Sequence, residues 1–422
     1  MKKIAVLLFL FALCGASLFA DISNSRGDAS SYLFPGLSDR PFQFRDSRLE
    51  RLGGTGVVLS TGMSSLYYNP ANLADNRMFM INVPQINLRL YNATKLLKIE
   101  GMRQFISDLL AGREISTERK LYITKMVIME YGYGVYPIVD AQVDVGFKVE
   151  GFAFDALVSG DITLYNLTGR TIDSKLIPSF TAGVSVGYGH KFKAGKIEIN
   201  AGLSFSLLMR VFLAGTGLAD FNEISNEFPG NLKTGVALQP PINIGVTAKF
   251  LDCLKASLVI RNINFFGTKV YSYGDFNHFL ANIFQVFGGG RDSDSESSMT
   301  NLGSGLFSSS VDLGVAYNPE WDLFNPRVEI DFVNIFSFGK NAYYDNSNFF
   351  SHLKIGVEMY LLSFLKIGAG LNQGRICFGA TLDLWPIVID VDYGWVDASP
   401  TLGEAMTDRV SVCVKLGWDR SK

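Results

Sequence analysis

The chain has 422 residues, a formal net charge of −2, and 48% hydrophobic and 18% charged residues. Soluble domains carry about 25% charged residues, so this composition argues against an ordinary soluble secreted protein, and the near-neutral charge predicts no nucleic-acid partner. After the N-terminal leader, no stretch reaches the roughly 18 consecutive apolar residues of a membrane-spanning helix. A transmembrane β-barrel reconciles these features, because it spreads its apolar surface over alternate residues of many strands.

Residues 1–20 are predicted to be a signal peptide. Two lysines precede an apolar run, and small residues follow up to Ala20, which is the layout of a secretory leader. Cys14 offers a lipoprotein alternative, but the bulky Leu13 before it disfavours lipidation. Three cysteines follow the leader: Cys253, Cys377 and Cys413. Because they are odd in number and widely spaced, they predict neither a disulfide framework nor a zinc site.

Residues 21–75 show little strand pattern, whereas apolar and polar residues alternate in many segments of 76–422. In 139–150, valines, Ala141 and Phe147 form one face and charged residues the other. The same alternation recurs at 327–332, 387–395 and 410–418. Strict alternation predicts strands with two unlike faces. Seven charged residues are predicted to face the lumen of a barrel: Asp140, Asp144, Lys148, Glu329, Asp331, Asp390 and Asp392.

About fourteen such strands are predicted, and the fold class is all-β. The strands of a soluble β-sandwich or barrel also alternate between apolar and polar residues. The lengths of the connections are therefore needed to distinguish it from a membrane barrel. Tight joins such as Glu150-Gly151 and Trp385-Pro386 alternate with long ones such as 93–130 and 267–306. Outer-membrane barrels have short turns at one end, long loops at the other, and an even strand number. We therefore predict a monomeric antiparallel barrel in the outer membrane, formed by 76–422, that contacts lipid and the barrel assembly machinery. Residues 21–75 are predicted to be a plug in its lumen.

Two of the long connections have helical patterns of their own. Residues 98–119 place apolar side chains on one helix face, and 275–287 repeat aromatic residues at helical spacing. The members of this second set are Phe276, Phe279, Leu280, Phe284 and Phe287. A helix with so many aromatic residues is not expected to lie fully exposed to water, so another surface should pack against it. It either packs over the barrel mouth or forms an access groove for a hydrophobic ligand, and both interpretations stay open here.

The sequence contains no enzyme motif in the structural context that the motif requires. The run 183–187 matches a nucleophile elbow by its letters, but that motif needs a strand-turn-helix corner, and Ser185 lies within an alternating strand. The three histidines share no motif with one another, and the glycines of 52–56 do not follow a strand of a βαβ unit. The sequence therefore predicts no catalytic residue, no metal and no cofactor.

The stretch 48–74 resembles the N-terminal hatch of the FadL-type outer-membrane transporters of long-chain fatty acids and other hydrophobic compounds. In that family a glycine-rich stretch, an aromatic pair and an Asn-Pro-Ala motif precede the first barrel strand. The matching residues are Gly53, Gly54, Gly56, Tyr67, Tyr68, Asn69, Pro70 and Ala71. The family commonly has Gly after this motif. Asn72 stands here instead and also tolerates a left-handed turn. The sequence as a whole also resembles the FadL-like proteins of spirochaetes.

The resemblance implies uptake of a hydrophobic ligand by facilitated diffusion. An amphipathic molecule would land in an apolar groove between the long loops, move to an inner pocket, and pass when the hatch shifts. Apolar ligands suit an aromatic site with a basic group for a carboxylate. The alternative is a barrel that serves as a scaffold or surface attachment protein with little transport. A general diffusion porin is disfavoured, because a plug would block its pore.

Overall fold

The computed structural model describes most of the chain from residue 42 onward. The described residues are 42–74, 79–111, 113–130, 134–166, 175–195, 197–213, 216–217, 234–251, 253–265, 269–273, 276–281, 309–319, 321, 324–336, 349–397 and 406–419. The predicted signal peptide lies outside them. Among these residues, no helix has both the length and the apolar character needed to cross a membrane.

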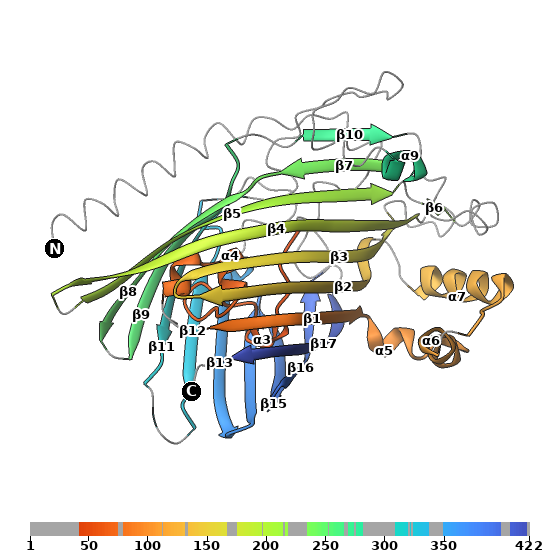
Figure 1. The fold of residues 1–422 in the computed structure, drawn as a ribbon. Coiled ribbons are helices and arrows are strands. Elements are labelled where there is room, and N and C mark those ends of the chain that lie inside the picture. The colour runs from red at the N-terminus through yellow and green to blue at the C-terminus, as the bar shows by residue number, and fades with distance from the viewer. Residues whose placement is uncertain are drawn as a thin grey trace.

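The wall of the molecule is a ring of antiparallel strands (Figure 1). Its strands are β1 (Met80–Tyr91), β2 (Gly134–Val149), β3 (Phe152–Asn166), β4 (Lys175–Ala194), β5 (Ile197–Leu213), β8 (Ile242–Leu251), β9 (Leu254–Ile263), β11 (Ser310–Tyr317), β12 (Arg327–Phe332), β13 (Leu353–Leu362), β14 (Leu365–Asn372), β15 (Arg375–Leu384), β16 (Ile387–Asp397) and β17 (Met406–Asp419). Each pairs with the next, and β1 pairs with both β2 and β17, so the ring is closed. In the described part of the chain, the predicted antiparallel barrel of fourteen strands is confirmed.

The two faces of the wall differ as the alternation predicts. On β2, Val143 and Val145 are each 42% exposed and point outward, whereas Asp144 is fully buried and points inward. All seven predicted lumen residues are buried inside the ring. A closed sheet leaves no unpaired edge, so the apolar outer face can meet an apolar environment without exposing backbone polar groups.

The strand connections divide into two classes by the end of the barrel at which they lie. Tight turns join β2 to β3 at Glu150-Gly151, β13 to β14 at Ser363-Phe364, and β15 to β16 at Trp385-Pro386. We call this end the short-turn end; β1 begins there and β17 ends there, because Met80 pairs with Asp419. The opposite end carries the longer connections, which agrees with the predicted asymmetry.

Three further strands extend the wall at the long-connection end: β6 (Thr216–Gly217), β7 (Thr234–Gln239) and β10 (Lys269–Tyr273). β7 continues β8 in one register along β5, with Leu208 opposite Gln239 and Phe205 opposite Ile242. Pro240 and Pro241 lie between β7 and β8 and interrupt the hydrogen bonding of the strand, because proline has no backbone N–H to donate. β7 and β8 therefore form one long strand that the two prolines interrupt.

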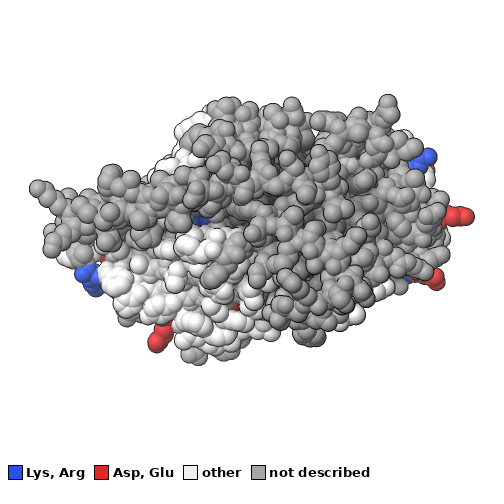
Figure 2. Space-filling model, turned by 90° about the horizontal axis from the view of Figure 1, so that it is seen from above, with Lys and Arg blue, Asp and Glu red and all other residues white. Residues whose placement is uncertain are grey.

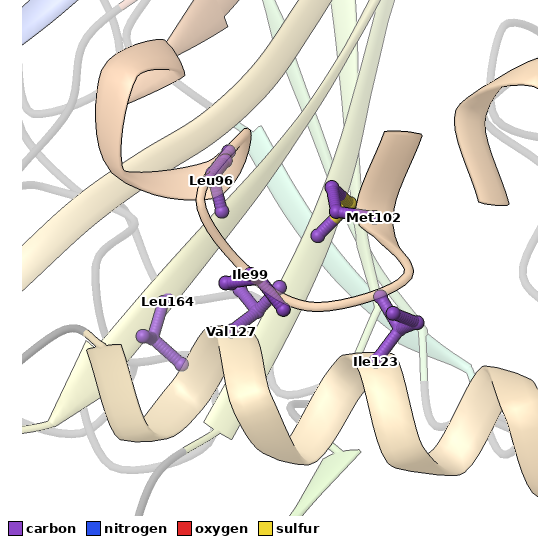
Figure 3. Packing of buried hydrophobic residues seen from close by; sticks show 6 residues of the cluster. All are labelled: Leu96, Ile99, Met102, Ile123, Val127 and Leu164. Carbon is purple, nitrogen blue, oxygen red and sulfur yellow. The ribbon is translucent and has the colours of Figure 1, made fainter. Parts of the chain in front are cut away.

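Helices fill part of the connection between β1 and β2. They are α5 (Ala93–Leu96), α6 (Met102–Leu110) and α7 (Thr117–Glu130). Their buried side chains pack with Leu164 of β3 in one apolar cluster (Figure 3): Leu96, Ile99, Met102, Ile123, Val127 and Leu164. Within the range 98–119 predicted to be helical, α6 covers only Met102–Leu110, and a second helix, α7, begins at Thr117 and runs to Glu130. Ser116 accepts a hydrogen bond from the Arg119 N–H, an N-cap contact that starts a new helix there.

Candidate functional site

Residues 42–74, which we call the inner segment, lie inside the barrel. The segment contains α3 (Ser47–Arg51), α4 (Ser64–Tyr68) and the 3₁₀ helix η1 (Pro70–Ala74). α3 contacts β14 to β17, and η1 contacts β4, β5 and β8 across the lumen. Figure 1 shows α3 and α4 within the ring of strands. The segment therefore bridges opposite parts of the wall.

The glycines after α3 allow the segment to approach the wall closely. The Asp46 side chain caps α3 by accepting the N–H groups of Arg48 and Leu49. Gly53 and Gly54 then adopt φ angles of +72° and +74°, a region that favours glycine. A Cβ on Gly53 would lie 2.3 Å from the Leu371 carbonyl oxygen of β14. At this position the predicted glycine motif is thus required by backbone shape and by close packing.

Buried ion pairs hold α3 to the wall. Arg51 is fully buried and bonds Glu358 of β13 at 2.6 Å and Asp390 of β16 at 2.9 Å. Arg48 binds the same Glu358 through two nitrogens, at 2.7 and 3.0 Å. Burial opposes the charge on Arg48, but Glu358 outweighs it, so the pKa of Arg48 lies above its usual value. The Arg48 guanidinium therefore stays charged at any ordinary pH.

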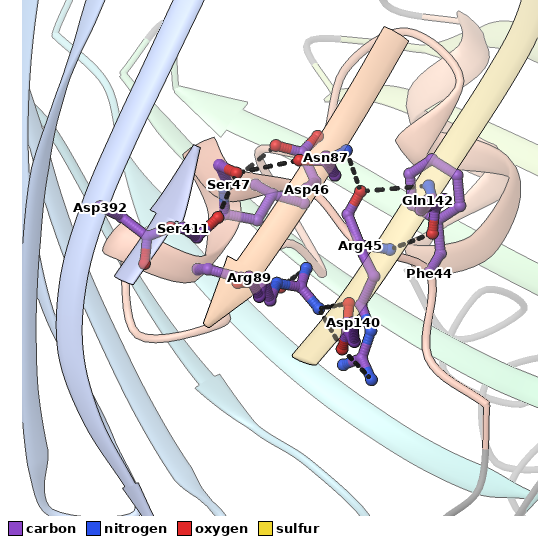
Figure 4. A network of polar contacts seen from close by, with 12 residues as sticks. Phe44, Arg45, Asp46, Ser47, Asn87, Arg89, Asp140, Gln142, Asp392 and Ser411 are labelled. Carbon is purple, nitrogen blue, oxygen red and sulfur yellow. Dashed lines mark hydrogen bonds and ion pairs between the residues drawn. The ribbon is translucent and has the colours of Figure 1, made fainter. Parts of the chain in front are cut away.

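A second set of ion pairs lies beside the first, where the inner segment faces β1, β2 and β17 (Figure 4). Glu50 pairs with Arg89 and, at 3.1 Å, with Arg409. Arg45 and Arg89 both bind Asp140, at 3.1 and 3.3 Å. Arg409 also holds Asp392 at 2.6 Å. The two sets place Asp140, Asp390 and Asp392, predicted only as lumen-facing, in direct contact with the network that anchors the segment: Arg45, Arg48, Glu50, Arg51, Arg89, Glu358 and Arg409.

Two carboxylates of β12 bind the backbone of the inner segment instead of its side chains. Asp331 accepts the N–H groups of Gly56 and Val57, at 2.8 and 3.1 Å. Glu329 accepts those of Val58 and Leu59, at 2.5 and 3.2 Å. Four consecutive backbone donors are thus satisfied in a stretch that has no regular secondary structure.

The two remaining predicted lumen residues lie on β2. Asp144 accepts a hydrogen bond from the Gln142 side-chain amide at 2.9 Å, and Lys148 is buried on the same strand.

The Asn-Pro-Ala motif contacts a part of the wall where glycines leave no side chains in the way. The Asn69 amide donates to Thr247 at 3.1 Å and to the Val57 carbonyl at 2.6 Å, and its oxygen accepts the Ala71 N–H. Beneath the motif three wall glycines face inward on neighbouring strands: Gly189, Gly202 and Gly245. A Cβ on Gly202 would lie 2.2 Å from the Pro70 carbonyl carbon. We call these three residues the glycine seat.

The aromatic pair joins the inner segment to the polar wall. Tyr67 stacks on Phe44 with ring centroids 4.2 Å apart, and its hydroxyl donates to Asp155 at 2.7 Å. The Tyr68 hydroxyl is 3.4 Å from the Phe44 carbonyl oxygen, and Arg261 lies 5.9 Å from its ring centroid. Burial, and then the nearby carboxylates, raises the pKa of Tyr67 and of Tyr68. Both hydroxyls therefore keep their protons and act as donors.

A cavity of about 240 Å³ opens against this face of the inner segment. Its aromatic lining is Phe42, Phe44, Tyr67, Tyr68 and Tyr91. Its cationic lining is Arg45, Arg261, Lys354 and Arg409, with Glu50 as the one carboxylate among the described lining residues. Three of the cations bind carboxylates of the protein, whereas Lys354 Nζ donates to the Gly54 carbonyl at 3.1 Å. The cavity thus combines apolar surface with arginines that are paired with carboxylates and with Lys354, which is bound to a backbone carbonyl.

The predicted access groove is only partly within the described residues. Phe276 begins α9 (Phe276–Ala281). Phe279 is buried and packs against Met209, Val211 and Val236 on the outer face of β5 and β7. Leu280 is 48% exposed. Phe284 and Phe287 lie outside the described residues. The structure thus brings Phe279 to the wall but not to the cavity, and the groove stays a prediction.

Sequence reasoning missed two parts of this site. The arginines of the anchoring network carry no motif, because their partners lie 307 or more residues away in several cases. The glycine seat could have been found in the sequence, because a glycine occupies an inward position in each of three alternating strands: Gly189, Gly202 and Gly245. Glycine weakens a strand interior and often marks close backbone approach, which is its role here.

Comparison with known proteins gives distant likenesses only. No family model and no curated protein matches the chain. Among solved structures, the chain is similar to the Pseudomonas putida toluene transporter TodX at 10% identity, with 91% of this chain and 100% of that chain covered and a TM-score of 0.45. The Ralstonia pickettii toluene transporter TbuX has 10% identity, 90% and 98% coverage, and a TM-score of 0.43. A Pseudomonas aeruginosa FadL homologue has 11% identity, 86% and 94% coverage, and a TM-score of 0.38.

The last of these belongs to the family that the stretch 48–74 resembles. The structures named above come from Pseudomonas and Ralstonia, so the narrower similarity to spirochaete proteins finds no support among them.

Proposed function

We propose that the protein is a non-enzymatic outer-membrane channel that takes up hydrophobic small molecules with an acidic head group, such as long-chain fatty acids, and that the inner segment is its plug. The observation that carries this proposal is the cavity, where aromatic rings and cations meet against a segment that crosses the lumen. A scaffold would not need a cavity of this kind inside the barrel.

The outer face of the barrel supports a place in a membrane. Large apolar side chains are exposed on strand after strand, among them Leu88, Val158, Leu203, Ile330 and Ile376. An exposed apolar patch larger than a few hundred Å² is rare on soluble monomers. A closed antiparallel barrel with such an outer face and a polar lumen has the design of outer-membrane barrels.

The cavity chemistry supports an anionic amphiphile more than a plain hydrocarbon. A carboxylate would form a charge-assisted hydrogen bond with a lining cation, which a hydrocarbon would not. Lys354 is the best-placed partner, because its ammonium binds a neutral carbonyl and lines the cavity. Pockets for drug-sized ligands are about 300–1,000 Å³. At about 240 Å³ the cavity is smaller than this range, so it would hold only a head group with a short apolar segment, and the rest of the chain would extend along the lumen.

The experiment is equilibrium binding of oleate, oleyl alcohol and toluene to the purified protein in detergent. The wild-type protein is expected to bind oleate more tightly than oleyl alcohol, which has the same chain without the charge. Lys354→Gln is expected to weaken oleate binding about tenfold or more, since a hydrogen bond to a charged group contributes about 1.5–3 kcal/mol. The same substitution should leave oleyl alcohol binding unchanged.

Lys98→Gln is the matched control, because Lys98 is exposed and lies in the connection between β1 and β2. Equal loss in both variants would mean that general charge, not the cavity, attracts the fatty acid. If oleate and oleyl alcohol bind equally, the acidic head group plays no part and a neutral hydrophobic cargo takes its place. If none of the three compounds binds, a scaffold or attachment role becomes the better hypothesis.

The access groove is tested separately. We infer that the ligand passes α9, and Phe279→Asp would place a charge in the apolar contact with Met209 and Val211. Uptake of labelled oleate by cells is expected to fall, while binding of oleate to the purified protein stays within about twofold of wild type. Unchanged uptake with normal amounts of folded protein would remove α9 from the route.

A further inference from the structure

A tyrosine lies between two cations on the inner face of the wall, at the short-turn end of β12, β13 and β14. The guanidinium carbon of Arg327 is 5.6 Å from the ring centroid of Tyr360, and the Lys366 ammonium is 5.0 Å from it. Arg327 begins β12, whereas Tyr360 and Lys366 lie on either side of the turn at Ser363 that joins β13 to β14. We call Arg327, Tyr360 and Lys366 the cation clamp.

The strand register shows that the cation clamp faces the lumen. Arg327 lies opposite Glu358 across β12 and β13, and Lys366 lies opposite Tyr360 across β13 and β14. Glu358 bonds Arg51 of the inner segment, so the side chains at 358 and 360 of β13 both point inward. The charged side chains seen on the surface in Figure 2 lie mainly toward the ends of the molecule. The cations of the clamp differ from these, because they are directed into the barrel.

Both cations of the clamp have free N–H donors. Within the described residues, neither Arg327 nor Lys366 forms an ion pair or a side-chain hydrogen bond, and Arg327 Nε is buried without a partner there. Both oxygens of Glu358 are already bonded by arginines of α3. Asp383, two residues beyond the one that faces Lys366, forms no ion pair within the same residues. A cation over a ring is held by the quadrupole of the ring, so its N–H groups stay available to a carboxylate.

The cation clamp and the cavity lie on opposite sides of α3 along β13. Lys354 lines the cavity, Glu358 binds α3 further along the strand, and Tyr360 follows at the next inward position. At about 3.3 Å per residue, Tyr360 is roughly 20 Å from Lys354. A ligand that leaves the cavity toward the short-turn end would therefore pass α3 before it reaches the clamp.

We propose that the cation clamp is a second carboxylate site, which binds the acidic head group of the cargo on the short-turn side of α3. The two cations would donate charge-assisted hydrogen bonds to the carboxylate, and the Tyr360 ring offers apolar surface to the first part of the chain. This inference rests on the proposed function, because it takes the cargo to be an acidic amphiphile. It goes beyond that function by adding a binding position that lies past the inner segment.

The test is ¹³C NMR of carboxyl-labelled oleate bound to the full-length protein in detergent. Each bound carboxylate has its own surroundings, so two protein-bound resonances are expected beside that of oleate in micelles. Arg327→Gln with Lys366→Gln should remove one of them, because binding at that site weakens about tenfold or more. Lys354→Gln should remove the other. The matched control, Lys98→Gln with Lys125→Gln, removes two exposed lysines from the connection between β1 and β2 and should keep both.

The outcomes separate the cation clamp from the transport function. Absence of any protein-bound resonance in the wild-type protein would overturn both. A double clamp variant that keeps every wild-type resonance, or that loses both while still folded, would overturn the clamp alone and leave the cavity proposal intact. Loss of the clamp resonance on addition of an equal concentration of acetate would show a site for any small carboxylate and overturn its assignment to the cargo. Heat-modifiable gel mobility shows that each variant is folded.

Discussion

Replacement of Gly202 by alanine is expected to unseat the inner segment while the barrel stays folded. The new Cβ would lie 2.2 Å from the Pro70 carbonyl carbon and 2.4 Å from the Ala71 nitrogen. Ordinary contacts begin near 3.4 Å, so η1 must move by about 1 Å. The neighbours are backbone atoms, which cannot rotate away as a flexible side chain can.

The size of the effect follows from overpacking. An extra methyl group in a packed interior costs about 1–3 kcal/mol. Because the barrel is folded in both the seated and the displaced state, this cost shifts the balance between them by about 5-fold to about 140-fold. The assay is influx of a small polar dye into cells, which rises if the segment no longer fills the lumen.

The matched control is Gly160→Ala on β3. There the nearest atoms are carbons of the Phe180 ring at 3.2 and 3.4 Å, which a small side-chain rotation relieves. Dye influx should rise for Gly202→Ala and stay at the wild-type level for Gly160→Ala, with both proteins folded on a heat-modifiable gel. If the two variants leak equally, or neither leaks, the glycine seat does not hold the segment in place.

Three further predictions concern the contacts of the inner segment. Arg51→Leu removes one of the cations that bind Glu358 and Asp390, which keep Arg48 and Lys415; the loss of this buried partner should cost about 3–5 kcal/mol, measured as a lower urea midpoint, with a smaller loss for Arg51→Lys. Tyr67→Phe keeps the ring but deprives Asp155 of a donor, so the free energy of unfolding should fall by about 1–3 kcal/mol, and an unchanged urea midpoint would contradict the bond. Because the pKa of Tyr67 is raised above 10.0 in the folded protein, its stabilisation is complete below pH 10 and is lost as the pH rises further. Wild-type protein should therefore lose more stability above pH 10 than Tyr67→Phe does, and equal losses would refute the raised pKa.

The sequence predicts the barrel well because each face of a strand obeys a local rule. Asp144 is buried inside and Val143 is exposed outside, which follows from a period of two residues and needs no long-range information. The uneven connections likewise follow from chain order. The helices between β1 and β2 were placed less well, because capping at Ser116 divides a segment that the apolar pattern presents as continuous.

The contacts between segment and wall are harder to predict, because they join residues far apart in the chain. Arg51 meets Glu358 across 307 positions, and the alternation gives only the face of Glu358, not its partner. Phe279 illustrates the same limit: helical spacing shows an apolar face but not which surface covers it. In the structure, that surface is the outer side of β5 and β7.

The two halves of the inner segment are held by different forces, and this decides which half can move at least cost. The half around α3 is tied by buried ion pairs, and breaking one by loss of a partner costs about 3–5 kcal/mol. The half around η1 is tied mainly by neutral hydrogen bonds such as Asn69 to Thr247, worth about 0.5–1.5 kcal/mol net each, and by contact with the glycine seat. Between them, Glu329 and Asp331 accept hydrogen bonds from backbone N–H groups of the segment. A displacement that opens the lumen therefore costs least when η1 leaves its seat and α3 stays bound, which keeps the segment attached to the wall throughout.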